Sequence, residues 1–336
     1  MKLSILIPVF NVDKYIKRCL NSVYHQINKD MDVEVIIVDD GSSDGSGKIC
    51  DEYQSRYPDI TYIYHKDNEG AYPTRNFAFD HCHGDYIWFI DPDDYIETDV
   101  ISKIQNCVIE DNFPEVIIMN YRLFNDNSYG TFGKVSPEKN IMTGTDYLNR
   151  YVPNPYLWAN IYKKKFLTKN NIRFCDSLNT QGDWLFNVEV YVKANKILLS
   201  TINAYNYYKG NPTSTLNNRE PKHMYRGVEN SLLALAHMNE LIKKNCNKLV
   251  EKPLVEMRSM TTAGFLYSLF RFNFPKGFVD RKLTELKKME IYPVKKSVNN
   301  RRANHFLLLA NCKLLFLSVI QMRNHLFCLT KGRFFK

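Results

Sequence analysis

Apolar and polar positions in the first ninety residues form short apolar runs that alternate with longer stretches of helical period. The runs at 3–11, 34–39, 61–65 and 85–90 are rich in β-branched and aromatic residues, as buried strands are. In the stretches between them, apolar residues recur at steps of three and four, as one face of a helix requires. Helices are therefore expected at about 12–27, 44–57 and 72–82, with Asn11 as the N-cap of the first. This β-α-β-α order predicts an α/β fold with a mostly parallel sheet and helices on both faces.

The last third of the chain has a helical pattern without strands. Helices are expected at about 221–246, 252–273, 277–289 and 299–329, separated by prolines. We therefore predict two domains, 1–218 and 219–336. Within the first, about 1–120 should bind the nucleotide and about 121–218 should form the acceptor side.

Carboxylates follow two of the predicted strands. Asp91, Asp93 and Asp94 come directly after the run at 85–90, and Asp39 and Asp40 end the run at 34–39. Open α/β sheets bind ligands at the carboxyl ends of their strands, so these side chains are expected to share one crevice. Hard cations such as Mg²⁺ and Mn²⁺ prefer carboxylate oxygen, which points to a metal site. The alternative for each cluster is a solvated turn, since turns are rich in Asp and Pro.

Four ordered motifs carry a family resemblance. They are Pro8-Val9-Phe10-Asn11, the segment 38–44 (Val-Asp-Asp-Gly-Ser-Ser-Asp), Asn68-Glu69-Gly70 through Arg75-Asn76, and Asp91-Pro92-Asp93-Asp94. In this order and spacing the chain resembles the family 2 inverting glycosyltransferases with the GT-A nucleotide-sugar-binding fold. A looser match at 182–187 (Gly-Asp-Trp-Leu-Phe-Asn) resembles the acceptor-side segment of bacterial members.

The resemblance implies a donor site for a UDP-sugar. Pro8, Phe10 and Asn11 would line the base pocket, and Asp40 would accept a hydrogen bond from the uracil ring, with Asp39 helping on the same edge. Further donor contacts are implied for Asn68, Gly70, Arg75, Asp91 and Lys209. Lys209 and the stretch 213–215 belong to a loop that covers the diphosphate in relatives; an ordinary surface loop is the alternative.

The resemblance also implies a metal cofactor, Mn²⁺ or Mg²⁺, held by Asp93 with Asp91 and Asp94. Negative charge grows on the diphosphate as the sugar–phosphate bond breaks, and a cation stabilises that charge most in the transition state. Arg75 would support the same polyanion; a salt-bridged or solvated arginine is the alternative.

Inversion requires a base opposite the leaving group, and the resemblance gives that role to Asp183. Relatives usually have Glu-Asp where this chain has Gly182-Asp183, and they have small residues where it has Tyr72. Tyr72 is expected either to shape the sugar pocket or to pack in the core. Asp183 as a helix N-cap is the structural alternative. Trp158 and Trp184 are expected on the acceptor side.

Charge is distributed unevenly along the chain. Residues 219–336 carry 23 Lys and Arg against 8 Asp and Glu, and within 299–329 Asn304, Asn311, Ser318 and His325 form a polar stripe on an apolar helix. The resulting expectation is a peripheral contact with the inner face of the cell membrane, favoured by anionic headgroups. Packing within its own domain or in a homo-oligomer is the alternative. No nucleic-acid motif accompanies the basic residues.

Other chemistry is weakly indicated. The eight cysteines form no Cys-x-x-Cys pair, so neither a zinc site nor a disulfide framework is expected, and a cytoplasmic location fits. The first strand is followed by neither Gly-x-Gly-x-x-Gly nor a Walker-type loop. We therefore expect transfer of a hexose from a UDP-sugar to a hydroxyl of a glycan acceptor, expected to be lipid-linked, in capsule, lipopolysaccharide or teichoic-acid synthesis. The alternatives are a nucleotidyltransferase-like enzyme and a non-catalytic nucleotide-binding or scaffolding homologue.

Overall fold

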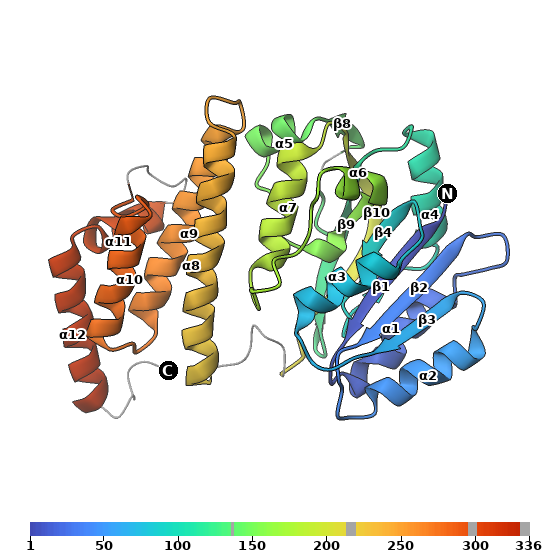
Figure 1. Cartoon of the computed structure of the whole chain (residues 1–336), viewed down its shortest axis with the longest axis horizontal. Coiled ribbons are helices and arrows are strands. Elements are labelled where there is room, and N and C mark those ends of the chain that lie inside the picture. The colour runs from blue at the N-terminus through green and yellow to red at the C-terminus, as the bar shows by residue number, and fades with distance from the viewer. Residues whose placement is uncertain (136–137, 213–219, 295–300, 330–336) are drawn as a thin grey trace. The chain divides into compact units, whose positions relative to one another are not determined.

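The structure is a computed structural model of the whole chain, and it describes residues 1–135, 138–212, 220–294 and 301–329. The chain divides into two compact units, Met1–Asn218 and Arg219–Lys336. Figure 1 shows the strands gathered in the first unit and the helices α8 to α12 of the second.

The first unit is built on one mixed sheet with the order β3-β2-β1-β4-β9-β6-β10-β5. Its strands are β1 (Leu3–Val9), β2 (Val33–Asp39), β3 (Thr61–His65), β4 (Tyr86–Phe89), β5 (Tyr95–Ile96), β6 (Val116–Asn125), β7 (Ser128–Tyr129), β8 (Asn140–Met142), β9 (Asn160–Lys163) and β10 (Ile197–Tyr208). Strands β3, β2, β1 and β4 pair in parallel, and so do β6 and β10. Strands β9 and β5 join antiparallel. The predicted α/β fold with a mostly parallel sheet is confirmed.

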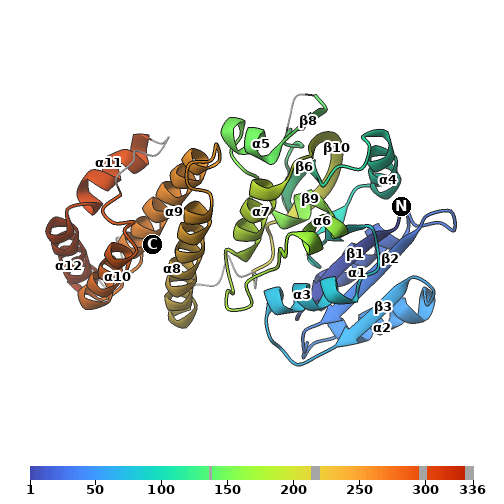
Figure 2. The same ribbon diagram turned by 45° about the horizontal axis from the view of Figure 1, so that its top comes forward.

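Helices cover both faces of this sheet. They are α1 (Asp13–Tyr24), α2 (Ser46–Arg56), α3 (Ala71–His81), α4 (Val100–Glu110), α5 (Gly144–Arg150), α6 (Lys164–Lys169) and α7 (Gly182–Lys193), with a 3₁₀ turn at Leu157–Ala159. Alternate side chains of β1, such as Leu3, Ile5 and Ile7, pack with apolar residues of α1 and α4 in one core. The other face lies behind α3, which crosses β1 and β2 (Figure 2). The polar strand ends therefore remain free to form a site at one edge of the sheet.

The N-terminus of α1 differs from the sequence prediction. Asn11 is not the N-cap; it has a positive φ of 50° and Val12 precedes the helix. The Asn11 side chain instead accepts the Ser43 N–H at 2.8 Å, while Ser46 Oγ accepts the Val12 N–H at 2.8 Å. The turn after β1 and the turn after β2 are thereby tied to each other.

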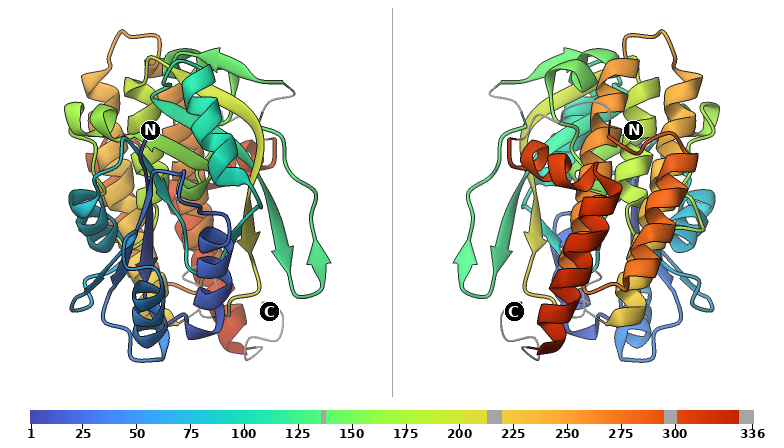
Figure 3. Two further views of the ribbon diagram at one scale, coloured as in Figure 1. Left: turned by 90° about the vertical axis from the view of Figure 1, so that its right-hand side faces the viewer. Right: turned by 90° about the vertical axis from the view of Figure 1, so that its left-hand side faces the viewer.

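The second unit contains α8 (Pro221–Lys244), α9 (Glu251–Arg271), α10 (Lys276–Lys288), α11 (Arg301–Ala310) and α12 (Lys313–Leu329). The single helix expected at 299–329 is wrong: α11 and α12 meet at a bend of 95°, visible in Figure 3. Asn311 lies at the break, where its side chain accepts the Val294 N–H and donates to the Val294 carbonyl. The predicted polar stripe is therefore not continuous.

A membrane span is not found as one helix. Within the described ranges no single helix is both long and apolar enough to cross a bilayer. The bent pair of α11 and α12 meets the length and composition required only when its two members are taken together.

Candidate active site

The carboxyl ends of β1, β2 and β4 bring the predicted donor residues to one edge of the sheet. In the parallel register Val9 lies beside Asp39, and Asp39 lies beside His65. Pro8 is buried within β1, whereas Phe10, directly after it, is 47% exposed and Asn11 is exposed. An exposed aromatic ring beside strand ends rich in carboxylates is suited to stacking on a planar base. Lys209, just after β10, is exposed.

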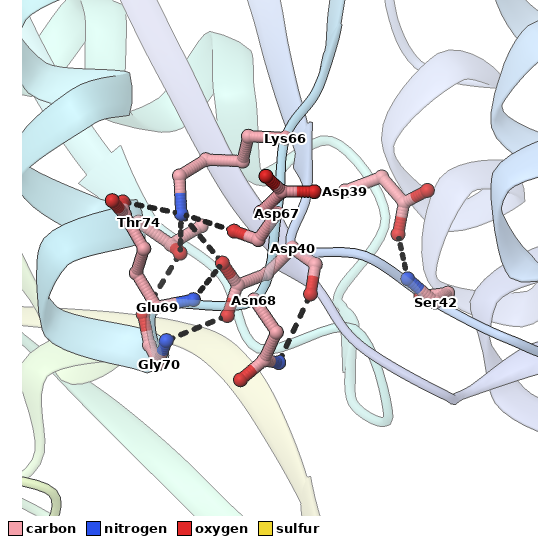
Figure 4. Close-up of polar contacts among 9 residues, drawn as sticks. All are labelled: Asp39, Asp40, Ser42, Lys66, Asp67, Asn68, Glu69, Gly70 and Thr74. Carbon is pink, nitrogen blue, oxygen red and sulfur yellow. Dashed lines mark hydrogen bonds and ion pairs between the residues drawn. The ribbon is translucent and has the colours of Figure 1, made fainter.

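Asp40 is the centre of a clasp that holds the loop after β3 (Figure 4). The Lys66 ammonium donates to Asp40 Oδ1 at 2.6 Å, and the Glu69 N–H donates to the same oxygen at 3.0 Å. The Gly70 N–H donates to Oδ2 at 2.8 Å, and Asn68 Nδ2 donates to the Asp40 carbonyl at 3.0 Å. A carboxylate offers about four acceptor positions, so one remains for a ligand. Asp40 thus lies where a base could bind, but its first role is to order Asn68 and Gly70.

Asp39 is held by different partners. Its Oδ1 accepts the Ser42 N–H at 3.0 Å, and its Oδ2 lies 3.0 Å from His65 Nδ1. The pKa of His65 is raised chiefly by this hydrogen bond and further by Asp51. Asp39 is 5% exposed and Asp40 is 3% exposed, so burial does not distinguish the two carboxylates, and Asp39 differs in supporting the turn after β2.

The turn that follows Asp40 depends on one glycine. Gly41 has a φ of 74°, and a Cβ there would lie 3.0 Å from the Asn68 backbone nitrogen. The left-handed conformation and the close approach of two loops both favour glycine.

Arg75 bridges two carboxylates from distant parts of the chain. Its Nη2 lies 2.7 Å from Asp91 Oδ1, after β4, and its Nη1 lies 3.0 Å from Asp183 Oδ1, in the first turn of α7. The arginine side chain is 8% exposed, against 25% for Asp91 and 31% for Asp183. Arg75 is therefore a salt-bridged arginine, as one of the two sequence interpretations proposed. Its bridge joins Asp91, which follows β4, to the predicted base Asp183.

Asp183 has the environment of a general base. Burial raises its pKa to about 6, Arg75 opposes that rise and Asp91 adds to it. A base poised near neutral pH suits proton transfer. Asp183 is not an N-cap, because α7 begins at Gly182 and Gln181 precedes it.

The three carboxylates after β4 do not act alike. Asp94 is fully buried, and its Oδ1 accepts the Tyr208 N–H at 2.7 Å while its Oδ2 has no partner. Within the described ranges no group of three acidic, His or Cys side chains is placed to hold a metal by itself, so a metal site at Asp91, Asp93 and Asp94 stays a prediction. Through its hydrogen bond with the Tyr208 N–H, Asp94 supports the end of β10.

Asp93 retains the properties of a cation ligand. It is partly exposed, and Asn211 Nδ2 donates to its Oδ2 at 2.9 Å. Burial raises the pKa of Asp93 most, and the nearby charge of Asp91 adds to the rise, so part of the shift comes from an excess of negative charge. A divalent cation would relieve that excess, so the residues present fit a metal at Asp93.

The two predicted acceptor-side tryptophans differ. Trp158 is 3% exposed and stacks on Tyr205 with ring centroids 4.3 Å apart, so a direct contact with an acceptor is ruled out as a role for it. The partly exposed ring of Tyr156 also stacks on Trp158, with ring centroids 4.7 Å apart. Trp184, next to Asp183 on α7, is partly exposed and remains compatible with the prediction.

Lys66 is a residue of this site that was not predicted from the sequence. The signal was available, because parallel pairing of β2 with β3 sets His65 beside Asp39 and hence Lys66 beside Asp40. The predicted loop residues 213–215 lie outside the described residues.

Curated relatives with similar sequences are bacterial glycosyltransferases. Glycosyltransferase GlyA of Streptococcus pneumoniae serotype 4 is 26% identical over 257 residues, which is 73% of this chain and 36% of that protein. The poly(ribitol-phosphate) beta-N-acetylglucosaminyltransferase TarS of Staphylococcus aureus is 26% identical over 281 residues, 83% of this chain and 46% of TarS. The chain thus spans between about a third and a half of these relatives' length.

Solved structures share the fold. The crystal structure of S. aureus TarS 1-349 in complex with UDP has a TM-score of 0.68 at 20% identity, covering 97% of this chain and 92% of that one. The mannosyltransferase PcManGT of Pyrobaculum calidifontis, in complex with GDP-Man and Mn²⁺, has a TM-score of 0.54 at 13% identity, covering 96% and 86%.

The family match covers the first half of the chain. Residues 4–175 match glycosyl transferase family 2, and that match includes the donor edge from β1 through Asp94. With the sheet order and the four motifs, this match shows that the chain belongs to glycosyl transferase family 2.

Proposed function

We propose that the chain is a metal-dependent inverting glycosyltransferase that moves a hexose from a UDP-sugar to a hydroxyl of a surface-glycan acceptor. The observation that carries the proposal is the Arg75 bridge, which holds the donor-edge carboxylate Asp91 and the candidate base Asp183 in one assembly. The names of the relatives support the substrate class, since TarS transfers N-acetylglucosamine to a poly(ribitol-phosphate) and was solved with UDP. A lipid-linked acceptor remains part of the proposal.

In this mechanism the chain's own residues orient the donor and move one proton. Phe10 and the free acceptor position of Asp40 would hold the base, while the clasped loop presents Asn68 and Gly70 to the donor. Asp93 would hold Mn²⁺ or Mg²⁺, which supplies charge stabilisation for the departing diphosphate. Asp183 would accept the proton of the acceptor hydroxyl as that oxygen attacks the anomeric carbon.

Substitutions at Asp93 and Asp183 should separate binding from transfer. Asp93→Asn is expected to abolish Mn²⁺-dependent UDP binding in calorimetry, because a neutral amide is a poor ligand for a hard cation. Asp183→Asn should keep UDP affinity within about twofold yet lower transfer by at least about a hundredfold. Equal loss of UDP binding in both variants would contradict these roles, and UDP binding without transfer by the unaltered chain would favour the non-catalytic alternative.

The pH dependence follows from Asp183. Its ionised form is the base and its pKa is about 6, so kcat at saturating donor and Mn²⁺ should be flat above about pH 7. Below about pH 5 it should fall about tenfold per pH unit as the carboxyl is protonated. Arg75→Gln removes the cation that lowers this pKa, and should move the midpoint of the profile upward. A rate that does not change between about pH 5 and 8 would argue against Asp183 as the base.

The clasp at Asp40 should control donor binding through the loop that it orders. Asp40→Asn loses the ion pair with Lys66 and weakens charge-assisted bonds worth about 1.5–3 kcal/mol each. Hydrogen exchange at the Glu69 and Gly70 amides should speed up by at least about tenfold, and UDP affinity should fall by a similar factor. Asp67→Asn, on an exposed side chain of the same loop, is the control. Unchanged exchange in Asp40→Asn would show that the loop is ordered by other contacts.

We also propose that the helical unit contacts an anionic membrane surface. Leu308 on α11 is 77% exposed and Leu314 on α12 is 80% exposed, and Leu315 and Met322 of α12 are exposed as well, in a unit with a large excess of Lys and Arg. Exposed apolar side chains with basic neighbours suit an interfacial helix pair.

Sedimentation with vesicles tests that contact. Binding to vesicles containing phosphatidylglycerol should exceed binding to neutral vesicles and weaken with salt. Leu308→Gln with Leu314→Gln should reduce it by about tenfold, while Leu249→Gln, an equally exposed leucine in the loop before α9, should not. If the chain instead sediments as an oligomer that the paired substitution dissociates, the patch is a subunit interface.

A further inference from the structure

The side chain of Tyr72 packs closely against the backbone of Gly182, the residue before Asp183. Tyr72, in the first turn of α3, is 5% exposed, and its hydroxyl oxygen accepts the Gly182 N–H at 2.8 Å. A Cβ at position 182 would lie 2.5, 2.6 and 2.9 Å from three atoms of the tyrosine ring. No side chain fits there while the ring keeps its position. Tyr72 therefore packs and does not line the sugar pocket.

The hydroxyl of Tyr72 meets a need of helix α7. Gly182 is the first residue of α7, and the first N–H groups of a helix have no partner within it. The side chain of Gln181, the residue before the helix, does not cap this terminus. The tyrosine supplies a partner from another helix, one residue before Asp183.

The ring of Tyr72 also supports the other contact of Asp183. The Arg75 guanidinium carbon lies 5.6 Å from the Tyr72 ring centroid and 5.9 Å from that of Phe174. Tyr72 and Phe174 are parallel within 6° at 5.7 Å, and Phe174 stacks on Phe186 of α7 at 4.3 Å. A continuous aromatic stack thus runs from α3 to α7, and it lies against the guanidinium that binds Asp183.

We propose that Tyr72 and Gly182 form an interlocked pair that positions Asp183, with Tyr72 as a positioning residue that acts through the Gly182 N–H and through Arg75. The inference rests on the proposed function, because positioning matters only if Asp183 takes a proton from the acceptor. Tyr72 fixes both attachments of Asp183, the start of its helix and its cationic partner. The two positions should therefore tolerate change only together.

A double-mutant cycle tests the pair. The full chain is assayed with Mn²⁺ for UDP binding by calorimetry and for hydrolysis of UDP-N-acetylglucosamine and UDP-glucose, in which water replaces the acceptor. Gly182→Ala alone should lower kcat by at least about tenfold, because the new methyl displaces the ring, with UDP affinity within about twofold. In a Tyr72→Ala background the same change should cost less than about threefold, since the ring is gone. An equal cost in both backgrounds would overturn the interlock.

Tyr72→Phe isolates the hydroxyl and keeps the ring volume. It should lower kcat by about tenfold with UDP affinity unchanged, and should leave the melting temperature close to that of the control Tyr86→Phe. Tyr86→Phe removes another buried tyrosine hydroxyl, which donates to the Pro114 carbonyl at the opposite end of β4, and should retain full kcat. If the alanine variants do not fold, this pair decides: equal kcat in both phenylalanine variants would sink the positioning role.

The outcome also separates the inference from the proposed function. If the unaltered chain neither binds UDP nor hydrolyses either donor, the proposed function fails on this panel and the inference falls with it. If the unaltered chain is active and Asp183→Asn is inactive, but the cycle is additive and Tyr72→Phe retains full kcat, the function stands and only the interlock is wrong.

Discussion

The Arg75 bridge is the interaction on which the geometry of the active edge depends. A guanidinium that is 8% exposed must be paired, because leaving a buried charge without a partner costs several kcal/mol, on the order of 3–5. Of its two partners, Asp91 follows the central strand β4 and Asp183 lies in the first turn of α7. Any shift of α7 against β4 would stretch one of these contacts. The bridge therefore sets the distance between Asp91 and the proposed base Asp183, a property that neither element possesses alone.

Local chemistry made much of the fold predictable from the sequence. Apolar β-branched runs identified β1 to β4, and the run at 61–65 matches β3 at both ends. Since parallel strands end at one edge, carboxylates at two strand ends had to lie on the same edge of the sheet, as Asp39, Asp40 and Asp91 do, with β1 between their strands. Helices α8, α9 and α10 were likewise predicted from the helical period of their apolar residues and from the prolines that separate them. These features depend on residues close together in the chain.

The features that could not be predicted depend on partners far apart in the chain. The pairing of Arg75 with Asp183, the burial of Asp94 beneath Tyr208, and the burial of Trp158 all require tertiary packing. The single helix expected at 299–329 failed because periodicity continues across Asn311, whose side chain bonds the Val294 backbone instead of the next turn. Asn11 has the usual chemistry of an N-cap, but its oxygen is used by the Ser43 N–H. At Asn311 and at Asn11, a hydrogen bond to a residue distant in the chain overrode a local preference.

Charge balance at the edge supports the proposed metal dependence. Arg75 already serves two carboxylates, so its charge cannot also compensate a diphosphate. Burial and neighbouring carboxylates raise the pKa of Asp94, which favours its neutral form. The adjacent residue, Asp93, is a partly exposed carboxylate. A diphosphate entering beside Asp93 would meet like charge in a partly desolvated site, where repulsion is stronger than in water. A divalent cation between them converts that repulsion into two attractions, so donor binding and metal binding should be a single coupled event.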